Sequence, residues 1–296
     1  MVKSKKVIAI TGASGYVGRN LIKFCIQNNV HVKAYCRDIN KLKHFNSNLL
    51  TVYKYKLGES LNHVSNVNTL IHLAHQRFTG ARNRNKEDIN KVGAIKILED
   101  VKKYKIKNVL YLSSIIAHDK TLSEYGKSKF NCENLFRKFN HNIIKVSMVF
   151  GGEPYGFYHK LLNDISNIKF MPIIFPNMPI DPVHIEDLCK FIIKNIFAEL
   201  RYESIILFKS KRKITTKIFF ILLAKKLFKK DIICLNLPSK LILQFFFVLS
   251  FFNGFFNKIF ERVAGLASHE INYKKNIIRI NEKDLKITNA FFYNIK

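Results

Sequence analysis

The first half of the chain alternates between short apolar runs and longer segments whose apolar residues recur at helical spacing. Residues 5–10, KKVIAI, form a continuous run rich in Val and Ile, which is typical of a strand buried on both faces. The same patterns predict further strands over 30–36, 67–74, 108–114 and 142–150, and helices over 18–29, 89–105 and 125–140. This alternation predicts an α/β fold, a doubly wound parallel sheet with helices on both faces.

The pattern loosens after about residue 150. Helices are predicted over 154–165, 184–197 and 215–228, separated by turns that contain Pro. We expect residues 151–296 to form a smaller, mostly helical lobe packed on a first domain of residues 1–150. A strand and a helix near 181–197 should return to the core of that first domain.

The segment TGASGYVG, residues 11–18, lies where the first strand should give way to the first helix. The first turn of a helix offers unpaired N–H groups and a partial positive charge, but a pyrophosphate fits there only if the backbone can approach it closely. Gly12 permits a tight turn, Gly15 has no Cβ to block the phosphates, and Gly18 lets the helix pack on the strand. We therefore expect a dinucleotide-binding Rossmann domain followed by a substrate-binding lobe; a tight connection without a ligand is the alternative. The loop residues expected to line the cofactor are Gly12, Ser14, Gly15, Tyr16, Val17 and Gly18.

The second strand should end beside the adenosine ribose, where an Asp would favour NAD. Here Cys36 takes the expected acid position and Arg37 follows it. A guanidinium suits a 2′-phosphate, so the cofactor is expected to be NAD(P), with NADP favoured over NAD. The alternative is that Arg37 is solvated and Asp38 serves the ribose.

Tyr125 and Lys129 lie at i and i+4 of a predicted helix and therefore on one face of it. A nearby ammonium stabilises a phenolate and lowers the phenol pKa, so that Tyr125 could exchange a proton with a carbinol or a ketone. Ser114 ends a strand at the sheet edge where sites of α/β proteins lie, and it could hydrogen bond the same substrate oxygen. The alternative is that Tyr125 and Lys129 are a solvated surface pair.

The net charge of +29, from 50 basic and 21 acidic residues, is consistent with an anionic partner. Lys, Asn and Ile are all abundant, as AT-rich coding would produce, and no compact basic motif stands out, so nucleic acid is not the expected partner. The chain has five cysteines, an odd number, and none of them forms a C-x-x-C motif. This pattern indicates a protein of a reducing compartment. No signal peptide is expected at the start.

Three further features have competing interpretations. His72 and His75 would point to opposite faces of a strand end, so no metal site is expected. Arg77 is expected either to contact a substrate diphosphate or to be solvated. The apolar run 241–252 is shorter than the roughly 20 residues of a spanning helix. Core packing is favoured for it, with peripheral membrane contact through Lys229, Lys230, Lys240 and Lys258 as the alternative.

Together these motifs resemble the extended short-chain dehydrogenase/reductase family, the NAD-dependent epimerase/dehydratase type, from Val7 to about Ile193. IHLAHQ, residues 71–76, is similar to the fourth-strand motif, which implies that Leu73 and Ala74 lie along the cofactor. LYLSSIIAH and YGKSK are similar to the catalytic segments. The resemblance implies three catalytic residues, Ser114, Tyr125 and Lys129, of which Lys129 also binds the nicotinamide ribose. Substrate contacts are implied for Arg77, Ser114 and Tyr125.

The resemblance further implies hydride transfer at a sugar carbon and a homodimer. The C-terminal region is similar to bacterial nucleotide-sugar 4-reductases and 4-epimerases of surface-polysaccharide synthesis. Dehydratases of the family carry an Asp-Glu pair where this chain has Ile115 and Ile116, which argues against 4,6-dehydration. The expected protein is a cytoplasmic oxidoreductase or isomerase acting on a nucleotide sugar. The alternative is a non-catalytic member that keeps the nucleotide for structure or sensing, or that binds RNA.

Overall fold

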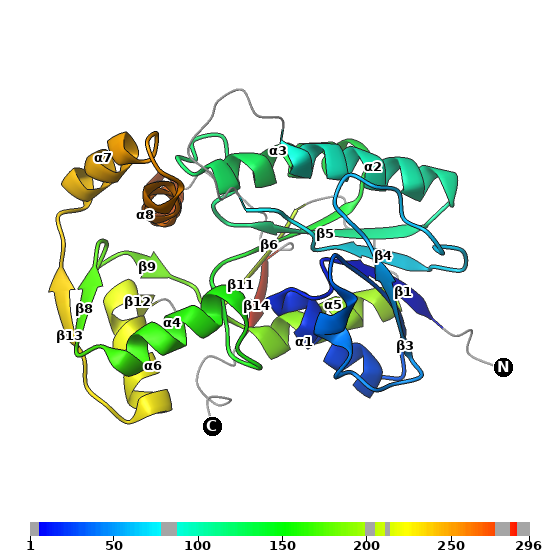
Figure 1. Ribbon diagram of the computed structural model, residues 1–296, viewed down its shortest axis with the longest axis horizontal. Coiled ribbons are helices and arrows are strands. Elements are labelled where there is room, and N and C mark those ends of the chain that lie inside the picture. Colours follow the sequence, from blue (N-terminus) through cyan, green and yellow to red (C-terminus); the bar gives the residue numbers. More distant parts are fainter. Residues whose placement is uncertain (1–5, 78–87, 199–204, 211–213, 276–284, 289–296) are drawn as a thin grey trace.

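The computed structural model describes residues 6–77, 88–198, 205–210, 214–275 and 285–288, which form a large parallel sheet with its helices and a smaller lobe beside it (Figure 1). The sheet has eight strands in the order β14-β11-β6-β5-β4-β1-β2-β3, and every neighbouring pair is parallel. Its strands are β1 (Val7–Thr11), β2 (His31–Cys36), β3 (Leu50–Lys54), β4 (Thr69–His72), β5 (Asn108–Ser114), β6 (Asn142–Val146), β11 (Ile206–Ser210) and β14 (Leu285–Thr288). From β1 the chain builds the sheet outwards in one direction, through β2 and β3, and then continues on the other side of β1 with β4, β5 and β6. Ligands of such sheets bind at the carboxyl ends of the two strands, here β1 and β4, between which this switch occurs.

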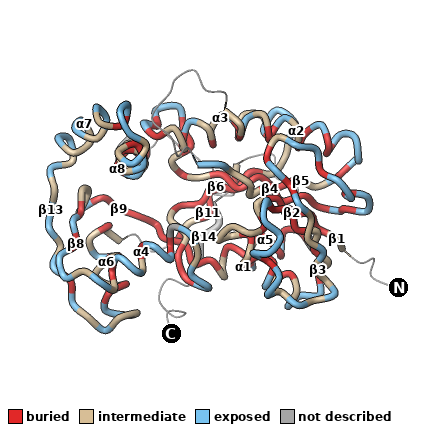
Figure 2. Tube along the Cα trace, in the orientation of Figure 1, coloured by how far each residue is buried: buried red, intermediate tan, exposed pale blue. Residues whose placement is uncertain are grey.

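Helices cover both faces of this sheet, because alternate residues of each strand point to opposite sides. In β1, Ile8 and Ile10 enter the core under α1 (Tyr16–Gln27) and α5 (Ile185–Ala198), whereas Ala9 enters the opposite core. That second core is covered by α2 (Ile89–Lys103) and α3 (Glu124–Lys138). Figure 2 shows the buried residues gathered along the strands between these two layers.

The smaller lobe has its own apolar core, which includes Phe150, Ile165, Met171 and Phe219. It contains the helices α4 (Gly156–Asn167), α6 (Thr216–Phe228), α7 (Ser239–Leu249) and α8 (Gly254–Lys275). Its short strands are β8 (Phe170–Ile173), β9 (Pro179–Ile180), β12 (Ile214–Thr215) and β13 (Ile233–Asn236). Two further short strands, β7 (Val149–Phe150) and β10 (Val183–His184), pair with each other. In the large sheet part, the 3₁₀ helix η1 (Ile39–Leu42) follows β2.

The structure confirms the predicted doubly wound α/β fold and the mostly helical C-terminal region. One expected strand, 142–150, is divided into β6 and β7, because the backbone changes partner: the Val183 N–H donates to the Met148 carbonyl, and β7 pairs with β10. In the second half of the chain, α5 packs on α1, and β11 pairs with β6. The domain boundary at residue 150 stays a prediction.

The apolar run at 241–252 differs from its expected core packing. No residue of α7 is buried, because among the described elements its main neighbour is a single helix, α8, which covers one side of it. The rings of Phe246 and Phe256 lie 6.3 Å apart across that contact, and those of Phe247 and Phe260 lie 5.5 Å apart.

Candidate active site

The glycine loop between β1 and α1 is tightly packed on two sides and open on the third. Gly12 has φ +68°, and a Cβ there would lie 2.6 Å from the Ala74 backbone nitrogen. A Cβ on Gly18 would lie 2.5 Å from the Ala13 carbonyl oxygen. A Cβ on Gly15 would come within 3.1 Å of the Gly12 carbonyl oxygen, and the described residues place no second atom within 4 Å of it, so beyond this close contact the described chain leaves space there.

This open space lies at the start of α1, for which Gly15 is the N-cap residue. No described side chain caps the helix, and its first turn has no acidic residue, so its positive end is left for an anion. The Tyr16 hydroxyl donates to the Gly151 carbonyl at 2.6 Å, so its proton is held within the protein. Contact of Ser14, Tyr16 and Val17 with a cofactor stays a prediction. The loop fits the diphosphate of a dinucleotide.

The end of β2 separates the two residues considered for the ribose. Arg37 is exposed, whereas the Asp38 carboxylate accepts from the Asn40 N–H at 3.0 Å as the N-cap of η1. The Cys36 thiol is buried, which raises its pKa, and it donates to the Asp38 carbonyl at 3.4 Å. A guanidinium is thus available at this point of the sheet.

The loop after β4 lies directly against the glycine loop. The Leu73 N–H donates to the Thr11 carbonyl at 3.2 Å, and Thr11 Oγ1 shares a hydrogen bond of 2.7 Å with His72 Nδ1. Leu73 and Ala74 are partly buried beside Gly12. Both residues therefore lie at the switch between β1 and β4, where the resemblance implies contact with the cofactor.

Tyr125, the second residue of α3, faces the residues that follow β4. Its ring lies edge-on to the His75 ring, with centroids 4.9 Å apart, and the Arg77 guanidinium lies 5.7 Å from its centroid. His75 Nε2 is buried and has no hydrogen-bond partner in the part of the chain that the structure describes. The structure therefore brings Tyr125, His75 and Arg77 together at the edge of the sheet that carries the glycine loop.

Lys129 lies one turn further along α3 and is buried. Its Nζ donates to the Leu112 carbonyl at 2.8 Å and lies 4.7 Å from the centroid of the Tyr111 ring. Burial lowers the pKa of this ammonium to about 8. Lys129 is therefore held against β5, and its Nζ makes no hydrogen bond with Tyr125 in the described structure.

The expected tuning of the phenol by Lys129 stays a prediction. Burial raises the pKa of Tyr125 above its ordinary value of 10.0, and the cation that opposes this rise is Arg77. The Lys129 ammonium is directed to the Leu112 carbonyl of β5.

Ser114 is the last residue of β5 and begins the short connection to α3. Its hydroxyl accepts from the Ile116 N–H at 3.5 Å, and its carbonyl accepts from the Ala117 N–H at 3.0 Å. Ser113, the preceding residue, points to the other side and donates to Glu133, which forms a buried ion pair of 3.1 Å with Lys145. Among the described residues, Ser114 and Tyr125 share no hydrogen bond.

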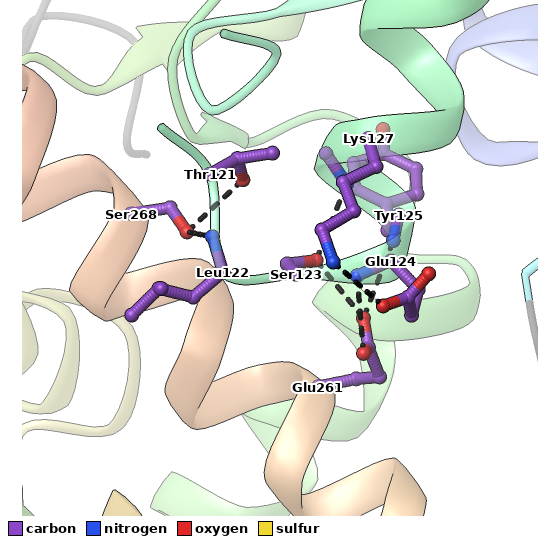
Figure 3. Close-up of polar contacts among 9 residues, drawn as sticks. Thr121, Leu122, Ser123, Glu124, Tyr125, Lys127, Glu261 and Ser268 are labelled. Atoms are coloured by element: carbon purple, nitrogen blue, oxygen red, sulfur yellow. Dashed lines mark hydrogen bonds and ion pairs between the residues drawn. The ribbon is translucent and has the colours of Figure 1, made fainter. Parts of the chain in front are cut away.

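The connection between β5 and α3 is fastened from the C-terminal lobe (Figure 3). The Glu261 carboxylate of α8 accepts from the Ser123 hydroxyl at 2.9 Å, the Glu124 N–H at 3.1 Å and the Tyr125 N–H at 3.3 Å. About two turns along α8, Ser268 Oγ accepts from the Leu122 N–H at 2.8 Å. The α8 helix therefore holds the end of α3 that carries Tyr125.

The geometry agrees with what a family comparison finds. Residues 8–194, more than half of the chain, match the model of the NAD-dependent epimerase/dehydratase family. The chain belongs to this family. The match confirms the resemblance that the sequence motifs carry. No curated protein matches the chain.

Solved structures with a similar fold include enzymes that act on sugar nucleotides. A dTDP-glucose 4,6-dehydratase from Bacillus anthracis, in complex with NAD, is 19% identical, with a TM-score of 0.64 over 79% of this chain and 85% of that chain. A UDP-glucuronic acid 4-epimerase from Bacillus cereus, in complex with UDP-glucuronic acid and NAD, is 16% identical, with a TM-score of 0.65 over 78% and 86%. At such identities the likeness establishes the fold.

Three residues of this family member were not found as site residues in the sequence. His75 was weighed only as a metal ligand, although its place three residues after His72 does put it at the carboxyl edge of the sheet. Asn90 of α2 donates to the Gln76 carbonyl at 3.0 Å and to Ser128 Oγ at 3.1 Å, so it joins the β4 loop to α3. Glu261 has no sequence signal, because it is 136 residues from Tyr125.

Proposed function

We propose that this family member is an NAD(P)-dependent enzyme that reduces a 4-keto group of a nucleotide-activated sugar or epimerises the sugar at that carbon. The proposal rests on one observation: Tyr125 contacts His75 and Arg77 in the loop after β4. Ala74, the residue before His75 in that loop, lies against Gly12 of the glycine loop. A phenol thus lies at the sheet edge that carries a dinucleotide-type loop. We further propose a role in surface-polysaccharide synthesis.

The proposed chemistry divides among few residues. A bound nicotinamide supplies or accepts the hydride. The Tyr125 hydroxyl gives a proton to the sugar oxygen during reduction and takes it back during oxidation, while the Ser114 hydroxyl donates a hydrogen bond to that oxygen. Arg77 stabilises negative charge at the same place, either on the phenolate or on the substrate diphosphate. Lys129, held on β5 by Leu112, is assigned to the nicotinamide ribose.

Elimination of water is not part of the proposal. It would need an acid and a base after Ser114, and the residues there are Ile115, which is buried, and Ile116. Hydride transfer with proton exchange at Tyr125 needs neither carboxylate.

We propose NADP as the preferred cofactor, with support from the exposed Arg37 that follows Cys36 at the end of β2. The two relatives described above contain NAD. Comparison of the dissociation constants for NADP and NAD, in the wild type and in Arg37→Ser, tests this assignment. A loss of affinity restricted to NADP is expected; equal losses for both would contradict it.

The proposed assay measures NADPH absorbance with a panel of UDP-4-keto sugars. Tyr125→Phe should lower kcat/KM by about 10² to 10⁴, the range that proton transfer by a placed group contributes. Tyr104→Phe, at the exposed end of α2, is the matched control and should leave it unchanged. Mass spectrometry of the nucleotide that co-purifies distinguishes a retained cofactor, as in an epimerase, from one released at each turnover.

A non-catalytic, nucleotide-keeping member is the second candidate. The direction of the Lys129 ammonium towards the Leu112 carbonyl, and not towards Tyr125, favours it. Tight nucleotide binding without turnover of any keto sugar would decide for this alternative and against the enzyme.

The proposal also includes a homodimer in a reducing, cytoplasmic environment. All five cysteines are free, and four of them are buried. Sedimentation velocity tests the dimer.

A further inference from the structure

The helix α7 presents a line of large apolar side chains away from the protein. Leu241, Phe245 and Val248 follow one another at spacings of four and three, which places them on one helical face, and they are 64%, 58% and 57% exposed. The turn after the helix continues this surface with Phe252, which is 79% exposed. Figure 2 shows α7 at the outer edge of the molecule, largely in the exposed colour.

The exposed apolar surface is larger than this line. We call it the α7 face, and its members are Leu241, Phe245, Val248, Phe252 and Phe255. Scattered exposed apolar residues need no explanation, but a contiguous group of this size marks a binding surface.

The charges around the α7 face are of one sign. The sequence contains no Asp or Glu between residues 232 and 260, whereas Lys240 and Lys258 flank the face and are exposed. Arg262 is also exposed on the next turn of α8. An apolar helix face flanked along the chain by exposed cations is complementary to an anionic lipid surface, where lysines meet phosphates and aromatic rings enter the acyl boundary.

The dimensions of α7 favour a position along the membrane surface. The helix has 11 residues, which is about 16 Å at about 1.5 Å per residue, against a hydrocarbon core of about 30 Å. No helix within the described ranges is long and apolar enough to cross a membrane. A second copy of the chain is a poorer occupant, since it would bring the same cations to the contact and each chain carries a net charge of +29.

We propose that the α7 face docks this protein on an anionic phospholipid surface, with α7 lying parallel to the membrane. This inference does not rest on the proposed enzymatic activity, because lipid binding is measured without cofactor or substrate.

The test is co-sedimentation of the full chain with vesicles of phosphatidylcholine mixed with phosphatidylglycerol, and with vesicles of phosphatidylcholine alone. Binding to the anionic vesicles is expected, with weaker binding to the neutral ones and a decrease as salt is raised. The double variant Leu241→Ser/Phe252→Ser should lower the partition coefficient by about tenfold or more, because both side chains would enter the lipid. The matched control is Phe139→Ser, which removes an exposed ring at the end of α3.

A second pair of variants tests the charge. Lys240→Glu/Lys258→Glu should weaken binding to anionic vesicles, whereas Lys102→Glu/Lys138→Glu, with the same change in net charge on α2 and α3, should weaken it much less. Absence of binding to anionic vesicles would overturn the proposal. So would equal loss of binding in both charge variants, or a serine double variant that binds normally. One further outcome would point to a different role. If the wild type binds no vesicles and the serine double variant has a different sedimentation coefficient from the wild type, the α7 face joins copies of the chain and the proposal is wrong.

Discussion

At the scale of single residues, Arg77 and Lys129 are two cations of the proposed site, and they contact different groups. Arg77 lies over the phenol ring and lowers the pKa of Tyr125, against the rise that burial causes. Lys129 is bonded to the backbone of β5. The proton of the proposed acid is therefore expected to respond to Arg77.

This difference predicts the pH dependence of Arg77 variants. In keto reduction Tyr125 must be protonated, so activity is lost as the pH rises through the pKa of the phenol. Arg77→Met removes the cation that stabilises the phenolate, so this alkaline loss should move to higher pH, while Arg77→Lys should keep it near its wild-type position. The measurement is kcat/KM for reduction as a function of pH. An unchanged alkaline limb in Arg77→Met would contradict the assignment.

The buried ammonium of Lys129 makes a prediction about stability. Its pKa is lowered from 10.5 to about 8, so between these values the unfolded chain binds the proton and the folded chain does not. The stability of the wild type relative to Lys129→Met should therefore be constant below about pH 8 and rise towards pH 10.5, in total by on the order of 3 kcal/mol. Urea unfolding of both proteins across this range measures it, and the difference cancels the titration of Tyr and Cys residues. A relative stability that falls with pH would be the wrong sign.

The sequence could predict the secondary-structure elements on which Tyr125 and Lys129 lie, but not the groups that their side chains contact. The spacing of Tyr125 and Lys129 placed both on one face of α3, and the glycine loop followed from its position after β1. The direction of Lys129 Nζ depends on a carbonyl of β5, and the cation over Tyr125 comes from the loop after β4. Contacts between segments of this separation leave no periodic pattern along the chain.

At the scale of elements, the contact between α8 and the start of α3 is the clearest dependence between the two parts of the molecule. One carboxylate, Glu261, accepts three hydrogen bonds there, from the Ser123 hydroxyl and from two N–H groups of the first turn. A carboxylate at a helix N-terminus also interacts favourably with the helix dipole.

We therefore expect Glu261→Gln to lower the free energy of unfolding by about 1 to 3 kcal/mol. The reason is that the three hydrogen bonds to the carboxylate would lose its charge and part of their strength. It should also lower kcat more than it raises KM for the sugar, because the group displaced is the proposed acid. The control is Glu99→Gln, an exposed residue of α2 paired with Lys96, for which both quantities should stay near wild type. Loss of stability with unchanged kcat would limit Glu261 to a structural role.

At the scale of the whole molecule, buried neutral histidines make stability depend on pH. Burial lowers the pKa of His72 to about 3 and that of His269 to about 4, from 6.5. Below pH 6.5 the unfolded chain takes up protons at these positions before the folded chain does, so stability should fall as the pH decreases through this range.

His269 offers the cleaner test, because neither ring nitrogen has a hydrogen-bond partner among the described residues. His269→Leu should reduce the loss of stability between about pH 6.5 and pH 4, measured by urea unfolding. His159→Leu, at an exposed position of α4, is the matched control and should keep the wild-type slope. Equal slopes in all three proteins would contradict the prediction.

The predictability of the molecule differs between its halves for a physical reason. Strands β1, β2, β4 and β5 are buried on both faces and bounded by helical segments, so their apolar runs stand out in the sequence. The lobe uses two-residue strands such as β9 and β12, which are too short to show alternation. The sequence favours core packing for residues 241–252 over an exposed position, and the structure has no buried residue in α7; an apolar helix has the same sequence pattern whether its second face contacts a core or a lipid.

The bonds from α8 to α3 have a consequence for protein engineering. Exchanging the C-terminal lobe for that of a relative, to change which sugar is accepted, would also exchange the carboxylate and the hydroxyl that fasten the proposed proton donor. A chimera of this kind should recover activity only when Glu261 and Ser268, or equivalents at the same two turns, are transplanted back into the graft.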